Sequence, residues 1–398
     1  MWKSGVSFVI LLVLLTTLTG CWNRRELNEL GIQMGTAIDK VGDQYQVTVQ
    51  VVVPGEVSTR QSSGRSTVTS YKATAPTLFE AFRKLTETSP RKIYSAHIRV
   101  LILGESLVKD GITNVLDILS RNPEARTDFY ILVARDVPAE KVLKILTSLE
   151  KIPASHLFYS LDTSAKTWSP TTTVTLDQLI DQLVTEGLNP VLTGVKLLGD
   201  QLVGEEKKSV EEIKPAAMLR NVGLAVFKKD RLVGWLNEDE SKGYNYIRDN
   251  VKSSAGHVSC PKGGLIGIET IRSHTKLKGT IVKGEPVIHI TVRNESNVTD
   301  AECQINLDDP QTIALLEKES EDHLIDLMRL SIEDVRKKYN VDIFGFGQAI
   351  HQANPKVWNR LKADWDEIFL HLKVEYDVQI TLKRIGTTVN SIKNDIKE

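Results

Sequence analysis

The chain has 398 residues, of which 41% are hydrophobic and 25% charged, and its formal net charge is −1. These values are typical of a folded protein of two or three domains, and the absence of a basic arm argues against a nucleic-acid-binding protein. Beyond residue 20, no apolar run approaches the roughly 18–20 residues that a membrane-spanning helix needs.

The first 20 residues have the layout of a secretion signal. Lys3 supplies a positive charge, residues 6–18 are mostly apolar, and the segment ends in Leu18-Thr19-Gly20-Cys21. Such a segment is typical of a cleaved targeting signal. Its apolar part is too short for a transmembrane helix to be the preferred interpretation. Its ending resembles a bacterial lipobox, which implies that Cys21 receives a diacylglyceryl group and becomes the first residue of the mature chain. The alternative is an ordinary signal peptide followed by a structural cysteine.

The region that follows the signal alternates between strand and helix patterns, which predicts an α/β sheet with helices on one or both faces. Gly42-Asp43 lies between two β-like runs and predicts a hairpin, and Thr77 opens a capping box that predicts a helix ending at Ser89-Pro90. The predicted segments are strands at residues 32–40 and 44–53, a flexible loop at 56–70, a strand at 93–103, a helix at 107–119, a strand at 129–134, a helix from Pro138 to about residue 149, a loop at 162–175, a capped helix from Thr175 to near Gly187, and a strand at 191–198.

Residues 199–215 are charged and form the candidate domain boundary. We therefore predict a signal peptide at 1–20, an N-terminal α/β region at 21–200 that could comprise two subdomains, and a C-terminal α+β domain at 215–390. The predicted fold class is α+β, a mixed α/β multidomain protein with several mixed sheets and a long C-terminal helix. The second part is predicted to contain a hairpin at 222–227 and 232–236, a helix at 238–249, β runs at 257–259, 266–277, 286–292 and 301–307, a helix at 310–340 that Ser331 could divide, a helix from Asn354-Pro355 to Leu372, a strand at 374–382, and a polar tail beyond Ile385.

The sequence predicts no catalytic residue, no metal site and no cofactor, because no motif with the required spacing is present. We interpret His97 as a packed core histidine, and Gly345 and Gly347 as residues that let the chain turn after the long helix. Acidic residues of that helix, including Glu317 and Glu321, are interpreted as a solvated face. Cys260 and Cys303 remain as an even pair once Cys21 is acylated, so a disulfide between them is one option.

Three stretches together resemble the Ger(x)C family, the C subunits of spore germinant receptors. They are residues 20–39 with Gly20-Cys21-Trp22-Asn23-Arg24-Arg25-Glu26-Leu27, residues 89–104 with Pro90-Arg91-Lys92-Ile93-Tyr94 and His97-Ile98-Arg99-Val100, and residues 342–386 with Asp342-Ile343-Phe344-Gly345-Phe346-Gly347, Pro355, Trp358 and Trp365. Asn23 departs from the pattern, where Asp is more usual in the family.

The resemblance implies a mixed α/β protein of three domains, lipid-anchored to the outer face of the spore inner membrane. It also implies that the protein acts in nutrient-triggered germination with an A-type subunit and a permease-like B-type subunit. The resemblance implies no catalytic residues. We expect Trp22, Trp168 and Trp235 to be exposed and to contribute to partner contacts, whereas Trp358 and Trp365 pack in a core. The alternatives are a lipid-anchored solute-binding protein and a secreted hydrolase.

Overall fold

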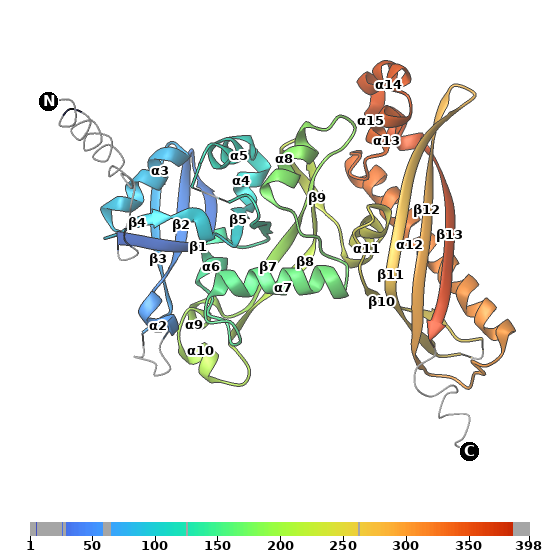
Figure 1. Cartoon of the computed structure of the whole chain (residues 1–398), viewed down its shortest axis with the longest axis horizontal. Helices are drawn as coiled ribbons and strands as arrows, with labels where there is room; N and C mark the ends of the chain where they lie inside the picture. The colour runs from blue at the N-terminus through green and yellow to red at the C-terminus, as the bar shows by residue number, and fades with distance from the viewer. Residues whose placement is uncertain are drawn as a thin grey trace.

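The computed structural model describes residues 5, 26, 29–58, 65–124, 126–261 and 263–384. The predicted signal, Cys21, Trp22 and the tail beyond Ile385 lie outside these residues. Two mixed β-sheets stand one after the other along the long axis of the molecule, each with its own helices (Figure 1). The predicted α+β class, with mixed sheets and a long C-terminal helix, is confirmed.

The first sheet has the strand order β3-β2-β1-β5-β6-β7-β8-β9, with β4 beside β1. Its parallel centre is covered on one face by α3, α4, α5 and α8 and on the other by α6 and α7, as expected for α/β alternation. The strands are β1 (Leu30–Val41), β2 (Gln44–Val52), β3 (Val68–Ala75), β4 (Lys92–Tyr94), β5 (Val100–Gly104), β6 (Tyr130–Ala134), β7 (Val191–Gly199), β8 (Ala217–Lys228) and β9 (Arg231–Trp235). The helices are α3 (Leu78–Lys84), α4 (Glu105–Asp110), α5 (Thr113–Ser120), α6 (Ala139–Lys144), α7 (Pro153–Thr167) and α8 (Leu176–Val184).

Short sequence motifs for turns and helix caps correctly predicted several elements of this half. The β1–β2 hairpin turns at Gly42 with φ of 58°, and Thr77 and Thr175 cap α3 and α8 as the capping boxes indicate. The predicted helix at 107–119 is wrong as one element, because Gly111 adopts φ of 135° between α4 and α5, a value that side-chain-bearing residues rarely adopt.

Four other predictions for this half are wrong. The helix predicted from Pro138 to about residue 149 ends at Lys144. The loop predicted at 56–70 contains the end of helix α2 (Pro54–Ser58) and the start of edge strand β3, whose small polar residues pair with β2. The strand predicted at 93–103 is divided into β4 and β5 by a turn at Ser95–His97. The loop predicted at 162–175 is helical up to Thr167, because α7 begins at Pro153 and buries Leu157 and Leu161 beneath a Ser- and Thr-rich outer face.

Strands β8 and β9 complete the first sheet, since β8 pairs with β7 in antiparallel register. Residues 200–215, with the short helices α9 (Gln201–Gly204) and α10 (Lys208–Glu211), therefore join two paired strands of one sheet. The candidate boundary at 199–215 falls inside this sheet, and the division into domains at 21–200 and 215–390 stays a prediction.

The second sheet has the order β10-β11-β12-β13, and α12 crosses one of its faces (Figure 1). Its strands are β10 (Ser254–Ser259), β11 (Leu265–Val282), β12 (Glu285–Ala301) and β13 (Lys373–Arg384), and its helices are α11 (Glu238–Ile247), α12 (Pro310–Tyr339), α13 (Phe346–Ala353), α14 (Pro355–Leu361) and α15 (Trp365–His371). The apolar core of this half also includes Val191, Leu224 and Val226 from the first sheet, so the two halves share buried surface.

Helix α12 is unbroken, which settles one alternative left open by the sequence. The buried Ser331 hydroxyl donates to the carbonyl oxygen of Glu240 at 2.8 Å rather than capping a new helix, and the helix ends at Asn340 in the left-handed region. Past Ala301, the run predicted at 301–307 is not a strand, and a turn at Lys362–Asp364 divides the helix predicted from Pro355 into α14 and α15.

The acidic face of α12 covers the open edge of β13. The Glu321 carboxylate accepts a hydrogen bond from the Ile380 N–H at 3.2 Å, and that of Glu317 accepts one from the Leu382 N–H at 2.9 Å. The interpretation of both residues as a merely solvated face is therefore wrong. They supply acceptors that an edge strand otherwise lacks.

Candidate functional site: the joint between the two halves

A buried carboxylate organises the loop that follows α12. Asp342 is 1% exposed, and its two oxygens accept five hydrogen bonds of 2.8 to 3.2 Å. The donors are the backbone N–H groups of Phe344, Gly345, Phe346 and Gly347 and the indole nitrogen of Trp365. The side chain thus closes residues 342–347 into a compact turn ahead of α13.

Burial raises the pKa of Asp342, and the five N–H donors oppose this effect because they stabilise the ionised carboxylate. The turn depends on glycine at Gly345, which adopts φ of 75° and whose carbon β position would lie 2.7 Å from the Arg248 guanidinium. The interpretation of Gly345 as a turn residue after the long helix is confirmed, whereas Gly347 lies in the first turn of α13.

The turn docks on the α8–β7 connection of the first half. Both the backbone N–H and the side-chain amide of Asn189 donate to the Asp342 carbonyl oxygen, at 2.9 and 3.2 Å. The Gln348 N–H donates to the Gly187 carbonyl oxygen at 3.2 Å, and a carbon β on Gly187 would lie 2.5 Å from the Gly347 carbonyl carbon. We call residues 186–189 together with 342–348 the joint.

A tryptophan and a lysine extend the joint at its margin. The Trp358 indole donates to Glu186 at 2.8 Å, and the Lys362 ammonium donates to the other oxygen of that carboxylate at 2.9 Å. The Lys362 hydrogen bond, followed by that of Trp358, lowers the pKa of Glu186. Trp358 and Trp365 are 2% and 5% exposed, which confirms that they are core residues.

The remaining aromatic predictions have mixed outcomes. Trp168 is 41% exposed, as expected, and the Lys242 ammonium lies 3.5 Å from its ring centroid. Trp235 is half-buried, so its predicted exposure is wrong: the Arg135 guanidinium covers its ring at 4.6 Å, and its backbone exchanges hydrogen bonds with the Tyr339 hydroxyl.

His97 is not a packed core histidine. It is exposed in the Ser95–His97 turn, where the chain leaves β4 before it enters β5. The apolar pattern around it misled the prediction because the turn places Ile98 inward and His97 outward.

Cys260 and Cys303 lie at one end of the second sheet, with their sulfur atoms within bonding reach and their Cα atoms 6.5 Å apart. They pack in an apolar cluster with Val258, Ile266 and Leu316. The position of Cys21, by contrast, lies outside the described residues.

We predict that the protein isolated without reductant carries the Cys260–Cys303 disulfide, because both sulfurs are buried within bonding reach and the predicted location is oxidising. Alkylation under denaturing conditions, followed by peptide mass spectrometry, should recover the two cysteines as one cross-linked peptide pair. Recovery of both as alkylated thiols from the unreduced protein would contradict the prediction.

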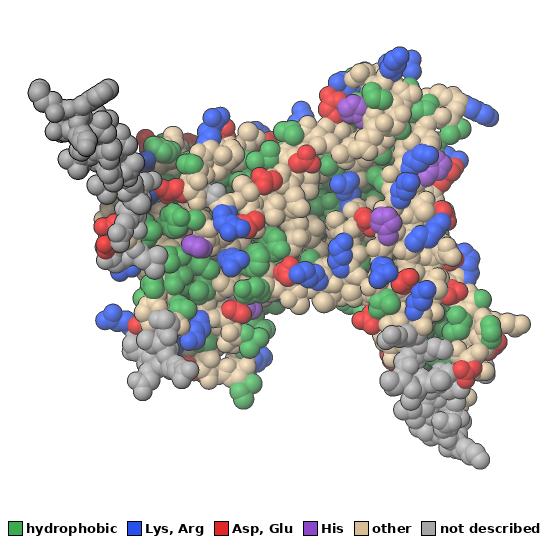
Figure 2. Space-filling model, viewed as in Figure 1, with side chains coloured by type: hydrophobic (Ala, Val, Ile, Leu, Met, Phe, Trp, Pro, Cys, Tyr) green, Lys and Arg blue, Asp and Glu red, His purple; other side chains and the backbone are tan. Residues whose placement is uncertain are grey.

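Within the described ranges, no group of three or more His, Cys, Asp or Glu side chains could hold a metal ion. No helix within the same residues is long and apolar enough to cross a membrane. On the face seen in Figure 2, acidic and basic side chains are interspersed over the second half.

Asp342 belongs to the stretch that carries the family resemblance, but its structural role was not predicted. An Asp two residues before Phe344-Gly345-Phe346-Gly347 is an Asx-turn signal that could have indicated the capped turn. No local signal could have identified Glu186, Gly187 and Asn189, because their partners lie more than 150 residues away in sequence.

Comparisons with known proteins cover both halves. The model "Spore germination protein N-terminal domain" matches residues 23–197, and "Spore germination B3/GerAC like, C-terminal" matches residues 222–386. Spore germination protein KC of Bacillus subtilis is 29% identical over 98% of each chain, and spore germination protein B3 of the same organism is 25% identical over 97% of this chain and 99% of its own. The crystal structure of the GerBC protein superposes with a TM-score of 0.52 at 21% identity, covering 87% of this chain and 96% of that one.

Proposed function

Because the chain belongs to the GerAC-type family of spore germination proteins, we propose that it is the C subunit of a nutrient germinant receptor. The observation that carries the proposal is the match along nearly the whole chain: the two family models together span residues 23–197 and 222–386, and the relatives align over nearly their full length. The subunit acts in the receptor without catalysing a reaction of its own.

The joint supports a role in which the two halves work as one body. Trp358, Trp365 and residues 342–347, which carry part of the family resemblance, form the contact between the halves rather than an open pocket. A shared apolar core, backbone hydrogen bonds and a buried carboxylate resist relative motion of the halves. A displacement of one half, such as that caused by contact with a partner, therefore moves the other half with it.

The subunit is held on the outer face of the spore inner membrane by lipid on Cys21. Each buried lipid CH₂ contributes about 0.8 kcal/mol, so two or three acyl chains retain the protein there. Confinement to the membrane raises its effective concentration toward the A-type and permease-like B-type subunits, and a modest interface then suffices for assembly.

Cys21→Ala tests the proposal in the native spore-former. We expect the variant to leave the membrane fraction and nutrient-triggered germination to be impaired. Asn23→Ala is the matched control, since it changes the same segment and keeps the cysteine, and it should stay in the membrane fraction. Retention of Cys21→Ala together with normal germination would overturn the lipid anchor, and normal germination of a complete deletion strain would overturn the receptor role.

A further inference from the structure

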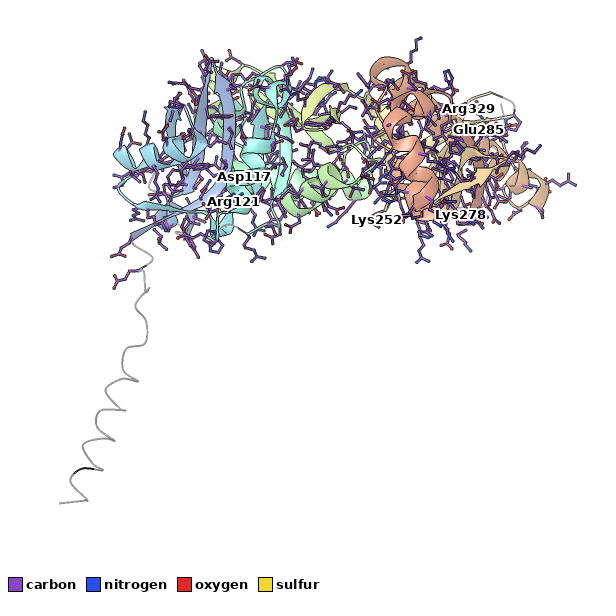
Figure 3. The ribbon with its side chains drawn as sticks, turned by 90° about the horizontal axis from the view of Figure 1, so that it is seen from above. Asp117, Arg121, Lys252, Lys278, Glu285 and Arg329 are labelled. Carbon is purple, nitrogen blue, oxygen red and sulfur yellow. A yellow bond between two sulfur atoms is a disulfide. The ribbon has the colours of Figure 1, made fainter. Side chains whose placement is uncertain are left out.

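The first half contains a cleft that the joint does not use. It has a volume of about 930 Å³ and lies between α3 and α5, over the start of β1 and beside β4. This volume is within the roughly 300–1,000 Å³ typical of small-molecule sites, which are mostly apolar with a few convergent polar groups. Figure 3 shows two of its rim residues, Asp117 and Arg121, together on α5.

The walls of the cleft are apolar and unevenly exposed. Phe129 is 1% and Leu119 8% exposed, and Phe82 and Ile118 are half-buried above them. Phe79 lies at the mouth of the cleft with 59% of its surface exposed, an unusual position for a large aromatic side chain.

The polar groups at the closed end of the cleft are neutral. Gln33 and Thr36 are each 1% exposed, and the Gln33 amide donates to the Thr36 hydroxyl. The Ser95 hydroxyl donates to the side-chain amide oxygen of Gln33 at 2.9 Å. Among the described residues, these bonds leave the second Gln33 N–H, the Thr36 hydroxyl hydrogen and the Ser95 oxygen for a bound molecule.

Charged side chains stay at the rim and are paired there. Lys92 and Glu124 form an ion pair, Arg121 pairs with Asp117 at 2.9 Å, and the Arg83 guanidinium lies 5.0 Å from the Phe79 ring centroid. A charged group at the closed end of the cleft would lose its hydration without meeting an opposite charge, so the cleft disfavours such a ligand.

We propose that this cleft binds a small, mostly apolar molecule whose inner end is an uncharged hydrogen-bonding group such as an amide, aromatic amine or hydroxyl. The inner end meets Gln33, Thr36 and Ser95, the body lies against Phe82, Leu119 and Phe129, and any charged group remains at the mouth. The site goes beyond the proposed receptor role and does not depend on the lipid anchor.

Two fluorescent probes with one skeleton test this proposal. N-phenyl-1-naphthylamine is uncharged, and 8-anilino-1-naphthalenesulfonate is the same molecule with a sulfonate. Titration uses the mature chain carrying Cys21→Ala, purified without detergent. We expect saturable binding of the neutral probe, at least tenfold tighter than that of the sulfonate. Equal or tighter binding of the sulfonate would overturn the chemical class, and no saturable binding of the neutral probe would overturn the site.

Ile118→Trp places added bulk in the cleft and should weaken binding of the neutral probe at least tenfold. Tyr159→Trp is the matched control: it adds the same side chain on α7, on the opposite face of the sheet, and should not change binding. If Ile118→Trp does not fold, Phe79→Ala at the exposed mouth replaces it, with a loss of about threefold expected. Binding that no cleft variant weakens would place the probe elsewhere and overturn the assignment.

Discussion

Asp342→Asn is expected to lower the free energy of unfolding by about 3–5 kcal/mol, because hydrogen bonds to a buried charge are each worth about 1.5–3 kcal/mol and an orphaned buried donor costs about as much again. The substitution keeps the shape of the side chain, but it turns an amide NH₂ toward N–H donors. Whichever way the amide is oriented, at least two of the donors around residue 342 lose their acceptor. Urea unfolding of the mature chain measures the loss.

Asp309→Asn is the matched control for this change. Asp309 caps α12 by accepting hydrogen bonds from the backbone N–H groups of Gln311 and Thr312, and Asn serves as well as Asp at a helix N-cap. We expect this variant to lie within about 0.5 kcal/mol of the parent protein. Similar losses for the two variants would show that the Asp342 hydrogen bonds do not stabilise the joint.

Gly187→Ala is expected to separate the two segments of the joint and to lower the free energy of unfolding by about 3 kcal/mol. A side chain in the left-handed region costs roughly 1–2 kcal/mol by itself, and Gly187 adopts φ of 78°. The added carbon would also lie 2.5 Å from the Gly347 carbonyl carbon and 2.6 Å from the Gln348 nitrogen, backbone atoms that cannot rotate away. Because Trp358 lies beside Gly347, its fluorescence should shift to the red as water enters.

Gly42→Ala is the control that distinguishes the effect of backbone strain from the effect of the close contact with Gly347. Gly42 also has positive φ, 58°, but nothing lies within 4 Å of the added carbon. It should show the backbone strain without any change in tryptophan fluorescence. If both glycine variants lose the same free energy of unfolding, contact with Gly347 contributes nothing, and the description of the joint as a tight backbone contact is wrong.

The elements that could be predicted are those specified by residues close together in the sequence. The apolar stripe of α12, the helix N-caps at Thr77 and Thr175 and the hairpin at Gly42 each combine a side-chain preference with a fixed spacing, and all four are present. Strand β3 was missed for the opposite reason: Ser70 and Lys72 are exposed at an edge and few of its residues are fully buried, so pairing with β2 rather than burial defines the strand.

The candidate site was only half predictable. The glycine run at 344–347 indicated a turn, but nothing in the sequence indicates that Glu186 and Asn189 would meet it, because such pairs depend on the completed fold. His97 and Trp235 failed similarly: a pattern of apolar neighbours shows that a segment is buried without showing which of its residues points outward.

The covered edge of β13 affects whether copies of the protein aggregate when they are close together. An uncovered strand edge is a template on which a second copy can add its own strand, and such pairing leads to aggregates. Here the acceptors on α12 already occupy the N–H groups of Ile380 and Leu382. A helix that packs on the sheet for stability therefore also keeps neighbouring copies from joining edge to edge, and molecules held close together in one plane can stay separate.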